Sequence, residues 1–335
     1  MNKISATIIK DSINPQGNRL TTFELIFPRY ILAELNTHRV FSKNSASSRA
    51  IPFNKMVKSV QEEPFIPIAF QKHHKGMQGN EYFTDPKEIE ELQNLWLKSR
   101  DKAVEEATTL YNAGVTKQLC NRLLEPFMYH KVLLTATDFA NFFDLRCPKY
   151  ITPVGGYDEN GTPYSFKSKK ETYRNHSNED NIKMMDNFTT EDWLSINQGQ
   201  AEIHIMDLAE KMYDAYQENK PVELKEFEWH SPYDDNILSL NEYMEFIGEP
   251  KEKKSSYVEE YSLFCLKISV ARCARLSYQT IGDNPKIDYF KDLELFDSLL
   301  ESRHWSPFEH VALCSKDNNY ANFRGFIQLR LLLDE

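Results

Sequence analysis

The sequence predicts a mixed α/β (α+β) protein, because the chain opens with two segments of strand character and continues with several segments of helical spacing. Residues 4–11 and 20–27 are rich in β-branched residues that alternate with polar ones. The turn-forming sequence N-P-Q-G-N of residues 14–18 separates them. We therefore expect a β-hairpin at the start of the chain.

Helical patterns follow the hairpin. Pro28 suits the first turn of a helix, and residues 30–38 continue with helical spacing, so residue 38 should lie at a helix-to-loop junction. Residues 85–112 place apolar side chains on one face, and Gly114 follows beyond the end. This long segment is expected to be a scaffold helix.

Further along the chain, a helix is expected from about residue 116 to 124, ending near Pro126, and residues 201–218 show an amphipathic helical stripe. Residues 148–197 are instead rich in Gly, Asn, Lys, Glu and Ser and have few aliphatic residues. We interpret that segment as an insertion or a lid on a single domain that spans residues 1–335.

Composition and charge argue against several classes of protein. The 335 residues include 41% hydrophobic residues, with 21 Phe and 17 Tyr, which is ample for a large core. The net charge of −10 argues against a protein that coats nucleic acid, although it is compatible with one local basic pocket. The five cysteines are scattered, with no C-x-x-C pair, and no apolar stretch is long enough to cross a membrane. We expect a soluble, cytoplasmic protein without a disulfide framework or a metal centre.

Motifs of several common enzyme classes are absent. The sequence contains no G-x-G-x-x-G after a strand and no G-x-x-x-x-G-K-[ST] loop. It also contains no G-x-S-x-G elbow and no H-E-x-x-H helix. A nucleotide or a flavin would have to be held in another way.

Residues 36–50, N-T-H-R-V-F-S-K-N-S-A-S-S-R-A, concentrate hydrogen-bond donors in what we expect to be a loop. Serine hydroxyls, the Asn44 amide and the Arg49 guanidinium could surround a phosphate, because arginine binds phosphate bidentately and short side chains let backbone N–H groups approach. The alternative is a solvated polar loop whose serines cap helices.

The same stretch resembles the R-H-R-x-x-S-x-N-E-x-S-x-R-Y signature of flavin-dependent thymidylate synthases, the ThyX family. The matching residues are His38, Arg39, Ser42, Asn44, Ser47 and Arg49. The stretch departs from the signature at Thr37, Ser45 and Ala50, where the family usually has Arg, Glu and Tyr.

A second block, N-R-L-L-E-P followed by D-F-A-N-F-F-D-L-R, resembles the family's R-x-x-L-P helix and its N-F-x-x-L-R segment. The resemblance matches Arg122 to an arginine that binds the nucleotide phosphate and Asn141 to an asparagine that contacts the flavin. It matches Arg146 to the arginine that polarises the uracil ring.

A third block near the C-terminus, V-A-R-C-A-R-L-S-Y and E-S-R-H-W-S-P-F-E-H, resembles segments that line the flavin and folate site of the family. It contains Ser277, His304, Ser306 and Glu309. In the family these segments precede the R-H-R signature, whereas here they follow it. The chain therefore resembles a circularly permuted member of the long, phage-type branch.

The resemblance implies a fold and a reaction. The fold is a central, mostly antiparallel sheet flanked by helices and enlarged by insertions, in a homotetramer. The N-terminal hairpin and a strand near Val311 would share that sheet. The reaction is the reductive methylation of dUMP to dTMP, in which NADPH reduces bound FAD and 5,10-methylenetetrahydrofolate supplies the carbon.

The resemblance also implies a role for each matching residue. Arg146 would be the catalytic residue, stabilising negative charge that develops on the uracil ring. The residues implied for substrate binding are Glu34, Ser47, Ser48, Arg49, Arg122 and Arg146. The residues implied for the flavin or the folate are His38, Arg39, Asn44, Asn141, Ser277, His304, Ser306 and Glu309. The expected partner is a pyrimidine deoxynucleotide rather than nucleic acid or a membrane, in the host cytoplasm if the protein is phage-encoded.

Alternatives to this interpretation stay open. The chain could be a flavin-dependent hydroxymethylase of dUMP or dCMP, or a non-catalytic homologue that binds a nucleotide or a flavin. Arg122 and Arg146 could be surface arginines in salt bridges, and Glu34, where the family often has Gln, could pair with Arg39. Cys147 directly follows Arg146 and could be a nucleophile with a lowered thiol pKa, or it could be inert.

Overall fold

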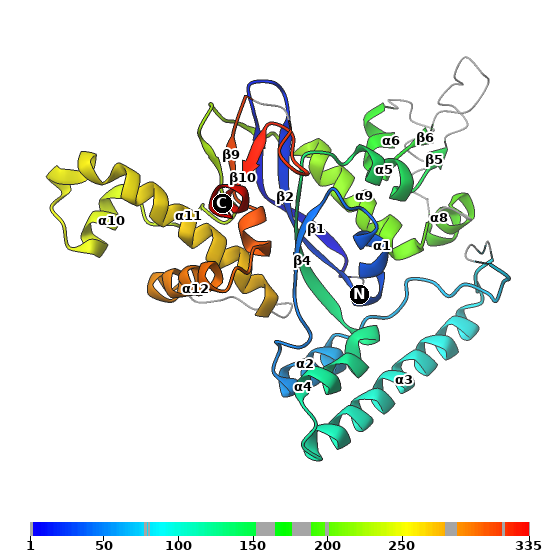
Figure 1. Cartoon of the computed structure of the whole chain (residues 1–335). Coiled ribbons are helices and arrows are strands. Elements are labelled where there is room, and N and C mark those ends of the chain that lie inside the picture. The colour runs from blue at the N-terminus through cyan, green and yellow to red at the C-terminus, as the bar shows by residue number, and fades with distance from the viewer. Residues whose placement is uncertain are drawn as a thin grey trace.

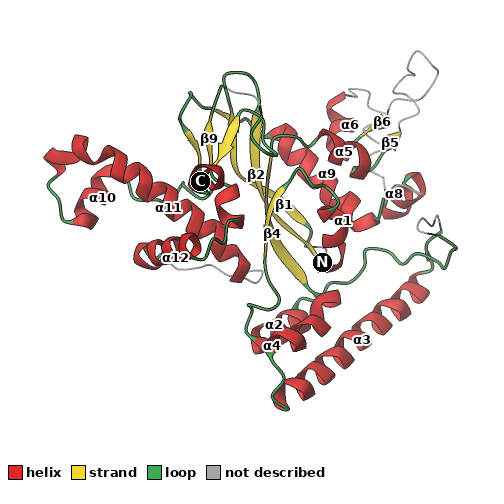
Figure 2. Cartoon of the chain, viewed as in Figure 1, coloured by secondary structure: helices red, strands yellow, loops and turns green. Residues whose placement is uncertain are grey.

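The computed structural model describes residues 3–76, 79, 81–151, 165–175, 189–197, 201–278, 287–316 and 319–334. Its centre is a five-stranded sheet in the order β3-β4-β2-β1-β7, flanked by helices (Figure 1, Figure 2). Among the described residues, the short pairing of β7 with β1 is the one parallel pairing in this sheet. The predicted mixed α/β fold with a mostly antiparallel sheet is confirmed.

The strands of the five-stranded sheet are β1 (Ser5–Ile13), β2 (Arg19–Pro28), β3 (Ser42–Ser45), β4 (Tyr129–Ala136) and β7 (Val222–Glu223). The other strands are β5 (Tyr150–Ile151), β6 (Ser165–Phe166), β8 (Trp229–His230), β9 (Ala312–Cys314) and β10 (Phe326–Gln328). The α-helices are α1 (Leu32–Asn36), α2 (Phe53–Glu62), α3 (Pro86–Asn112), α4 (Lys117–Cys120), α5 (Ala140–Arg146), α6 (Lys169–Asn175), α8 (Thr190–Ile196), α9 (Ile203–Glu218), α10 (Leu240–Ile247), α11 (Val258–Arg275), α12 (Tyr289–Glu301) and α13 (Leu329–Leu333). The 3₁₀ helices are η1 (Arg29–Ile31), η2 (Asn121–Phe127), η3 (Lys251–Tyr257), η4 (Leu276–Tyr278) and η5 (Ser306–Glu309).

The predicted N-terminal hairpin is formed by β1 and β2. Its register pairs Ser5 with Ile26 at one end and Ile13 with Arg19 at the other. Gly17 in the connecting turn has φ of +82°, a left-handed conformation that glycine adopts without a steric penalty. The hairpin prediction is confirmed.

Strand β4 lies between β2 and β3, and every one of its residues is buried. The expected loop over residues 36–50 is therefore partly wrong, because Ser42–Ser45 form β3 and pair antiparallel with β4. Backbone groups of β4 that are buried on this side need partners, and β3 supplies them although its side chains are polar. The donor-rich stretch is thus anchored to the centre of the fold.

Helix α9 packs on the sheet beside α5. Its residues Ile205, Leu208 and Met212 are fully buried in the same apolar cluster as Phe23 of β2 and Leu134 of β4. The amphipathic helix predicted for residues 201–218 is confirmed. Removal of this apolar surface from water is the main force that holds the helix on the sheet.

Helices α2, α3 and α4 lie together at the lower end of the molecule in Figure 1. The predicted helix over residues 85–112 is confirmed as α3, whose start is capped by the Asp85 carboxylate. The helix expected over residues 116–124 is confirmed only in part. It changes after one turn of α4 into the 3₁₀ helix η2, which contains Pro126, a residue that has no N–H for an α-helical hydrogen bond.

Among the described helices, none is both long and apolar enough to span a bilayer.

The strand near Val311 does not join the hairpin in one sheet, and that prediction is wrong. Strand β9 lies instead in a separate three-stranded sheet, between β10 and β8. The open side of β1 is occupied by β7, so β9 finds its hydrogen-bond partners elsewhere. The two sheets nevertheless contact each other through β1 and β8.

A chain of buried hydrogen bonds joins the two sheets. His230 of β8 bonds to Ser12 at 2.9 Å and to Thr22 at 2.8 Å. Thr22 bonds to Thr135 at 2.7 Å, and Thr135 bonds to Nδ1 of His310 at 2.8 Å. Burial lowers the pKa of His310 to about 3 and also lowers the pKa of His230, so both imidazoles are neutral in the folded protein.

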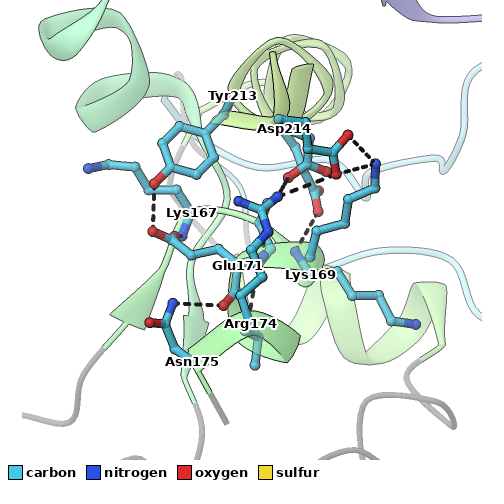
Figure 3. A network of polar contacts seen from close by, with 12 residues as sticks. Lys167, Lys169, Glu171, Arg174, Asn175, Tyr213 and Asp214 are labelled. Carbon is cyan, nitrogen blue, oxygen red and sulfur yellow. Dashed lines mark hydrogen bonds and ion pairs between the residues drawn. The ribbon is translucent and has the colours of Figure 1, made fainter. Parts of the chain in front are cut away.

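The described parts of residues 148–197 pack on α9. Figure 3 shows Glu171 of α6 bonded to the Tyr213 hydroxyl at 2.5 Å, and Arg174 in an ion pair with Asp214 at 3.9 Å. The backbone N–H of Lys169 donates to Glu210 at 2.9 Å. Residues 152–164 and 176–188 of the proposed insertion or lid lie outside the described residues.

The neutral histidines predict a loss of stability in acid. His310 titrates near 6.5 in the unfolded chain but at about 3 in the folded protein, so the unfolded state binds more protons below pH 6.5 and stability falls as the pH falls. Between pH 8 and pH 5 we expect His310 to account for a loss of about 2 kcal/mol in the free energy of unfolding.

Urea unfolding of the wild type and of H310N at pH 8 and pH 5 measures the contribution of His310 to this loss in the free energy of unfolding. H310N should lose about 2 kcal/mol less than the wild type on acidification. The control H73N, which removes an exposed histidine, should behave as the wild type does. Equal losses in H310N and the wild type would contradict the assignment of a neutral, buried His310.

Candidate functional site

A cavity of about 670 Å³ brings together polar residues from three distant parts of the chain. We call it the basic pocket. Its cationic residues are Arg29, Lys43, Arg49 and Arg122. Its other polar residues include Asn44, Ser45, Ser47, Ser48, Ser277, His304 and Ser306. Eight of the residues proposed from the sequence therefore line one cavity, namely Asn44, Ser47, Ser48, Arg49, Arg122, Ser277, His304 and Ser306.

The side chain of Asn44 connects the two ends of the chain at this pocket. Its amide nitrogen donates to the carbonyl oxygen of Cys273 at 2.7 Å. Its amide oxygen accepts from the hydroxyls of Ser277 at 3.1 Å and of Ser306 at 3.5 Å. The N–H of Ser47 also donates to the Ser277 carbonyl at 3.0 Å. These bonds fix β3 and the following loop against α11, η4 and η5.

Asn121 holds the same loop from the other side. This residue is fully buried, and its amide nitrogen donates to the carbonyl oxygens of Ser48 at 2.6 Å and of Ile51 at 2.9 Å. The Ser48 hydroxyl donates to Glu125 at 2.5 Å. Because Asn121 directly precedes Arg122, this contact sets Arg122 beside the serine-rich loop.

The charges of the basic pocket suit an anion. Arg29 donates to the Ala46 carbonyl at 3.1 Å and lies 3.8 Å from Glu125. Burial lowers the pKa of Arg29, Glu125 raises it, and nearby Arg122 lowers it. The side chains of Arg49 and Arg122 make no hydrogen bond or ion pair among the residues that the structure describes. Cations held close together with free donors are stabilised by a bound anion such as a phosphate.

A second cavity, of about 600 Å³, has aromatic walls, and we call it the aromatic cavity. Its walls include Tyr30, Phe70, Tyr82 and Trp96. Its ionisable residues include Glu34, Arg146, Glu202 and His204. Glu34 and Arg146, which the sequence assigned to the substrate, therefore lie in a different cavity from the other substrate residues.

Arg146 is held by the neighbouring turn. Its Nε donates to Nε2 of His38 at 3.1 Å, and its Nη2 donates to the Thr37 hydroxyl at 3.4 Å. Burial lowers the pKa of His38 to about 4, with further lowering by Arg146 and Lys43. A neutral His38 can accept the Arg146 hydrogen bond. The imidazole therefore lies between Arg146 and the rings of Phe41 and Phe142.

Four residues that the sequence assigned to the cofactor line neither cavity, namely His38, whose contact with Arg146 is described above, and Arg39, Asn141 and Glu309. Arg39 and Asn141 are exposed, and their side chains make no hydrogen bond or ion pair within the described part of the chain. Glu309 accepts from Arg330 at 2.5 Å, which directs it towards α13. The alternative pairing of Glu34 with Arg39 is likewise not seen among the described residues.

Cys147 does not have the lowered pKa considered from the sequence. Its side chain is 6% exposed, and burial together with the charge of Glu210 raises the pKa of the thiol. Cys147 belongs to the buried apolar cluster that α5 and α9 share, and the charge of Lys167, which lowers the pKa of the thiol, does not offset the effect of burial. The structure favours an inert cysteine.

Sequence reasoning missed Arg29, Lys43 and Asn121. Arg29 directly follows the Pro28 that marked a helix start, and Lys43 lies inside the donor-rich stretch itself. Asn121 directly precedes Arg122. A spacing argument that treated each basic residue near the donor-rich stretch as a possible ligand could have found Arg29 and Lys43, whereas no sequence signal identifies the buried role of Asn121.

Comparisons with known proteins give a limited result. No family model and no curated protein matches the chain. Two similar crystal structures are of the UMP/dUMP methylase PolB from Streptomyces cacaoi, bound with 5-Br UMP in one case and with 5-Br dUMP in the other. They are each 16% identical to this chain, with TM-scores of 0.36 and 0.38. The matches cover 44% and 59% of this chain and 78% and 65% of the PolB chains.

Metal chemistry has no evident centre in the described part of the chain. No group of three or more His, Cys, Asp or Glu residues is placed there to hold a metal ion.

The basic pocket predicts a binding phenotype for Arg122. R122A should weaken the binding of inorganic phosphate or a nucleoside monophosphate about 10- to 100-fold, because a hydrogen bond between charged groups contributes about 1.5–3 kcal/mol. Isothermal titration calorimetry measures the effect. R324A, which removes an exposed arginine paired with Asp138, is the matched control and should bind as the wild type does. Unchanged affinity in R122A would remove Arg122 from the site.

Proposed function

We propose that the protein is a flavin-dependent enzyme that transfers one carbon to C5 of a pyrimidine deoxynucleotide, in the manner of thymidylate synthases that convert dUMP to dTMP. The observation that carries this proposal is the basic pocket. Residues from three sequence blocks that resemble one family, far apart along the chain, line a single cavity, and the guanidinium groups of Arg49 and Arg122 have no partner there among the described residues. A chance resemblance of polar stretches gives no reason for them to meet.

The nucleotide phosphate is proposed to bind in the basic pocket. Arg49 and Arg122 would donate charge-assisted hydrogen bonds to it, and Ser47 and Ser48 border the same cavity. The net charge of the chain is −10, so this local concentration of cations is the feature that would draw a dianionic phosphate to one place.

Arg146 is proposed to stabilise the negative charge that develops on the pyrimidine ring. His38 and Thr37 hold its guanidinium before any substrate arrives, so little reorganisation is needed during the reaction. The neutral state of His38 matters here, because a protonated imidazole could not accept from Arg146 and would repel it.

FAD is the cofactor of this proposal, with NADPH and 5,10-methylenetetrahydrofolate as co-substrates. The basic pocket also contains residues that the resemblance assigns to the flavin or the folate, and one of them, His304, is exposed. Asn44, Ser277 and Ser306 form a preorganised hydrogen-bonded wall. When bound, the flavin would supply hydride to the pyrimidine.

We further propose that active sites are assembled from more than one copy of the chain, as in a homotetramer. The phosphate residues and Arg146 line different cavities of one chain. If the basic pocket of one copy faced the aromatic cavity of another, the phosphate-binding residues and Arg146 would reach the same substrate molecule. The native mass in solution, measured by light scattering, tests this directly, and a monomer at all concentrations would contradict it.

A second candidate is the hydroxymethylation of dUMP or dCMP. Glu34 favours this second candidate. Its carboxylate lines the same cavity as Arg146, at a position where the ThyX family, which the sequence resembles, often has an amide. A changed residue beside the base is compatible with a changed base or a changed product.

An anaerobic reduction assay tests the proposed function. The purified protein should take up FAD, and NADPH should bleach the flavin bands faster when a pyrimidine deoxynucleotide is present. Mass spectrometry of the nucleotide after addition of methylenetetrahydrofolate then separates a methylated from a hydroxymethylated product. A protein that takes up no FAD would contradict the proposal, and flavin uptake without turnover would indicate a non-catalytic homologue.

The His38–Arg146 contact predicts a split between kcat and KM. H38L removes the acceptor of the Arg146 hydrogen bond and should lower kcat about tenfold or more, with a smaller change in nucleotide KM. H38Q keeps an acceptor near Nε2 and should recover part of the activity. Equal kcat in H38L and the wild type would contradict the positioning role, and a loss confined to KM would assign His38 to binding.

A further inference from the structure

Two polar groups of the aromatic cavity are left without partners among the described residues. Oε2 of Glu34 is buried and accepts no hydrogen bond. Nη1 of Arg146 donates no hydrogen bond, because the two bonds of that side chain use Nε and Nη2. Buried polar groups in folded proteins are rarely left unpaired, so the open acceptor of Glu34, in a cavity that Arg146 also lines, points to a ligand.

The other polar residues of this cavity are already paired. Glu202 accepts from the Tyr30 hydroxyl at 2.8 Å and from His204 Nδ1 at 2.6 Å. Its second oxygen accepts from the backbone N–H groups of His204 and Ile205 at the start of α9. Nε2 of His204 accepts from the N–H of Ile68 at 2.9 Å, and the amide of Gln71 is bonded to Gly79 and His74. Glu34 is therefore the carboxylate of this cavity that is available to a ligand.

A carboxylate acceptor and a guanidinium donor that line one cavity can distinguish the two pyrimidine bases. Cytosine presents an amino donor at N4 next to acceptors at N3 and O2. Uracil presents an acceptor at O4, a donor at N3 and an acceptor at O2. An ionised carboxylate only accepts hydrogen bonds and an arginine only donates them. A carboxylate that accepts from N4 and a guanidinium that donates to N3 and O2 would satisfy the polar groups of cytosine. In uracil, O4 would face the carboxylate, and neither group would have a donor for that contact.

We propose that Glu34 and Arg146 together read the hydrogen-bonding edge of a 4-aminopyrimidine, so that the protein prefers dCMP to dUMP. This inference rests on the proposed function and specifies its substrate. Arg146 keeps its role at the ring, because donation to N3 and O2 stabilises negative charge there. Glu34 distinguishes the amino group at N4 of cytosine from the carbonyl oxygen O4 of uracil.

The walls of the cavity suit a planar base. Trp96 is fixed by donation from its indole N–H to the Phe65 carbonyl at 2.7 Å, and Tyr30 is fixed by Glu202. Rigid aromatic side chains provide surfaces on which a base can stack. Stacking does not distinguish cytosine from uracil, so selectivity is left to Glu34 and Arg146.

Calorimetric titration of the full-length protein with dCMP and with dUMP tests the inference, in the presence of FAD. The wild type should bind dCMP at least tenfold more tightly than dUMP, because a mismatched base leaves buried polar groups unpaired. E34Q should reduce the ratio to about twofold or reverse it, since the Gln amide can donate to O4 of uracil. E81Q removes an exposed carboxylate near the same cavity and should keep the wild-type ratio.

The outcomes separate the inference from the proposed function. A wild type that binds dUMP as tightly as dCMP, or more tightly, overturns the inference and leaves the proposed function standing. Tighter binding of dGMP than of either pyrimidine also overturns it. If neither pyrimidine nucleotide binds and no FAD is taken up, the proposed function fails and the inference fails with it. The wild-type ratio is decisive even if E34Q does not fold.

Discussion

The organisation of the basic pocket depends on the hydrogen bonds of one buried amide, that of Asn44. This residue lies on β3, whose backbone is fixed by β4 at the centre of the sheet. Its side chain reaches the end of α11 and the serines of η4 and η5. The N-terminal loop and the C-terminal helices are thus held together by an interaction that requires both a donor and an acceptor on one short side chain.

Electrostatics then separates the two cavities by function. The basic pocket concentrates four cations, of which Arg49 and Arg122 lack partners among the described residues, and this favours a phosphate. The aromatic cavity contains two carboxylates. Burial and the charges of both carboxylates raise the pKa of Tyr30, so that its phenol stays protonated. A cavity with one open carboxylate and one open guanidinium favours a neutral, polar ring rather than a second phosphate. The division matches the two chemical parts of a nucleotide, although they lie in separate cavities of one chain.

Much of the fold follows from local sequence patterns. The hairpin and helices α3 and α9 have clear periodicity and good terminal signals, so they could be predicted. The polar residues of β3 could not, because that strand forms to satisfy the backbone of β4 rather than to bury its own side chains. The separate sheet of β8, β9 and β10 was also missed, since two- and three-residue strands leave no periodicity to read. Among the site residues, Ser47, Arg49 and Arg122 were placed together by pattern, whereas the separation of Arg146 from them depends on where α5 packs.

The central claim is that the basic pocket holds the phosphate of a pyrimidine nucleotide, and a crystal structure of the protein with bound dCMP or dUMP tests it most directly. The account predicts phosphate density between the guanidinium groups of Arg49 and Arg122, beside Ser47 and Ser48. Phosphate density at any other place, with the basic pocket filled only by solvent, would contradict the account.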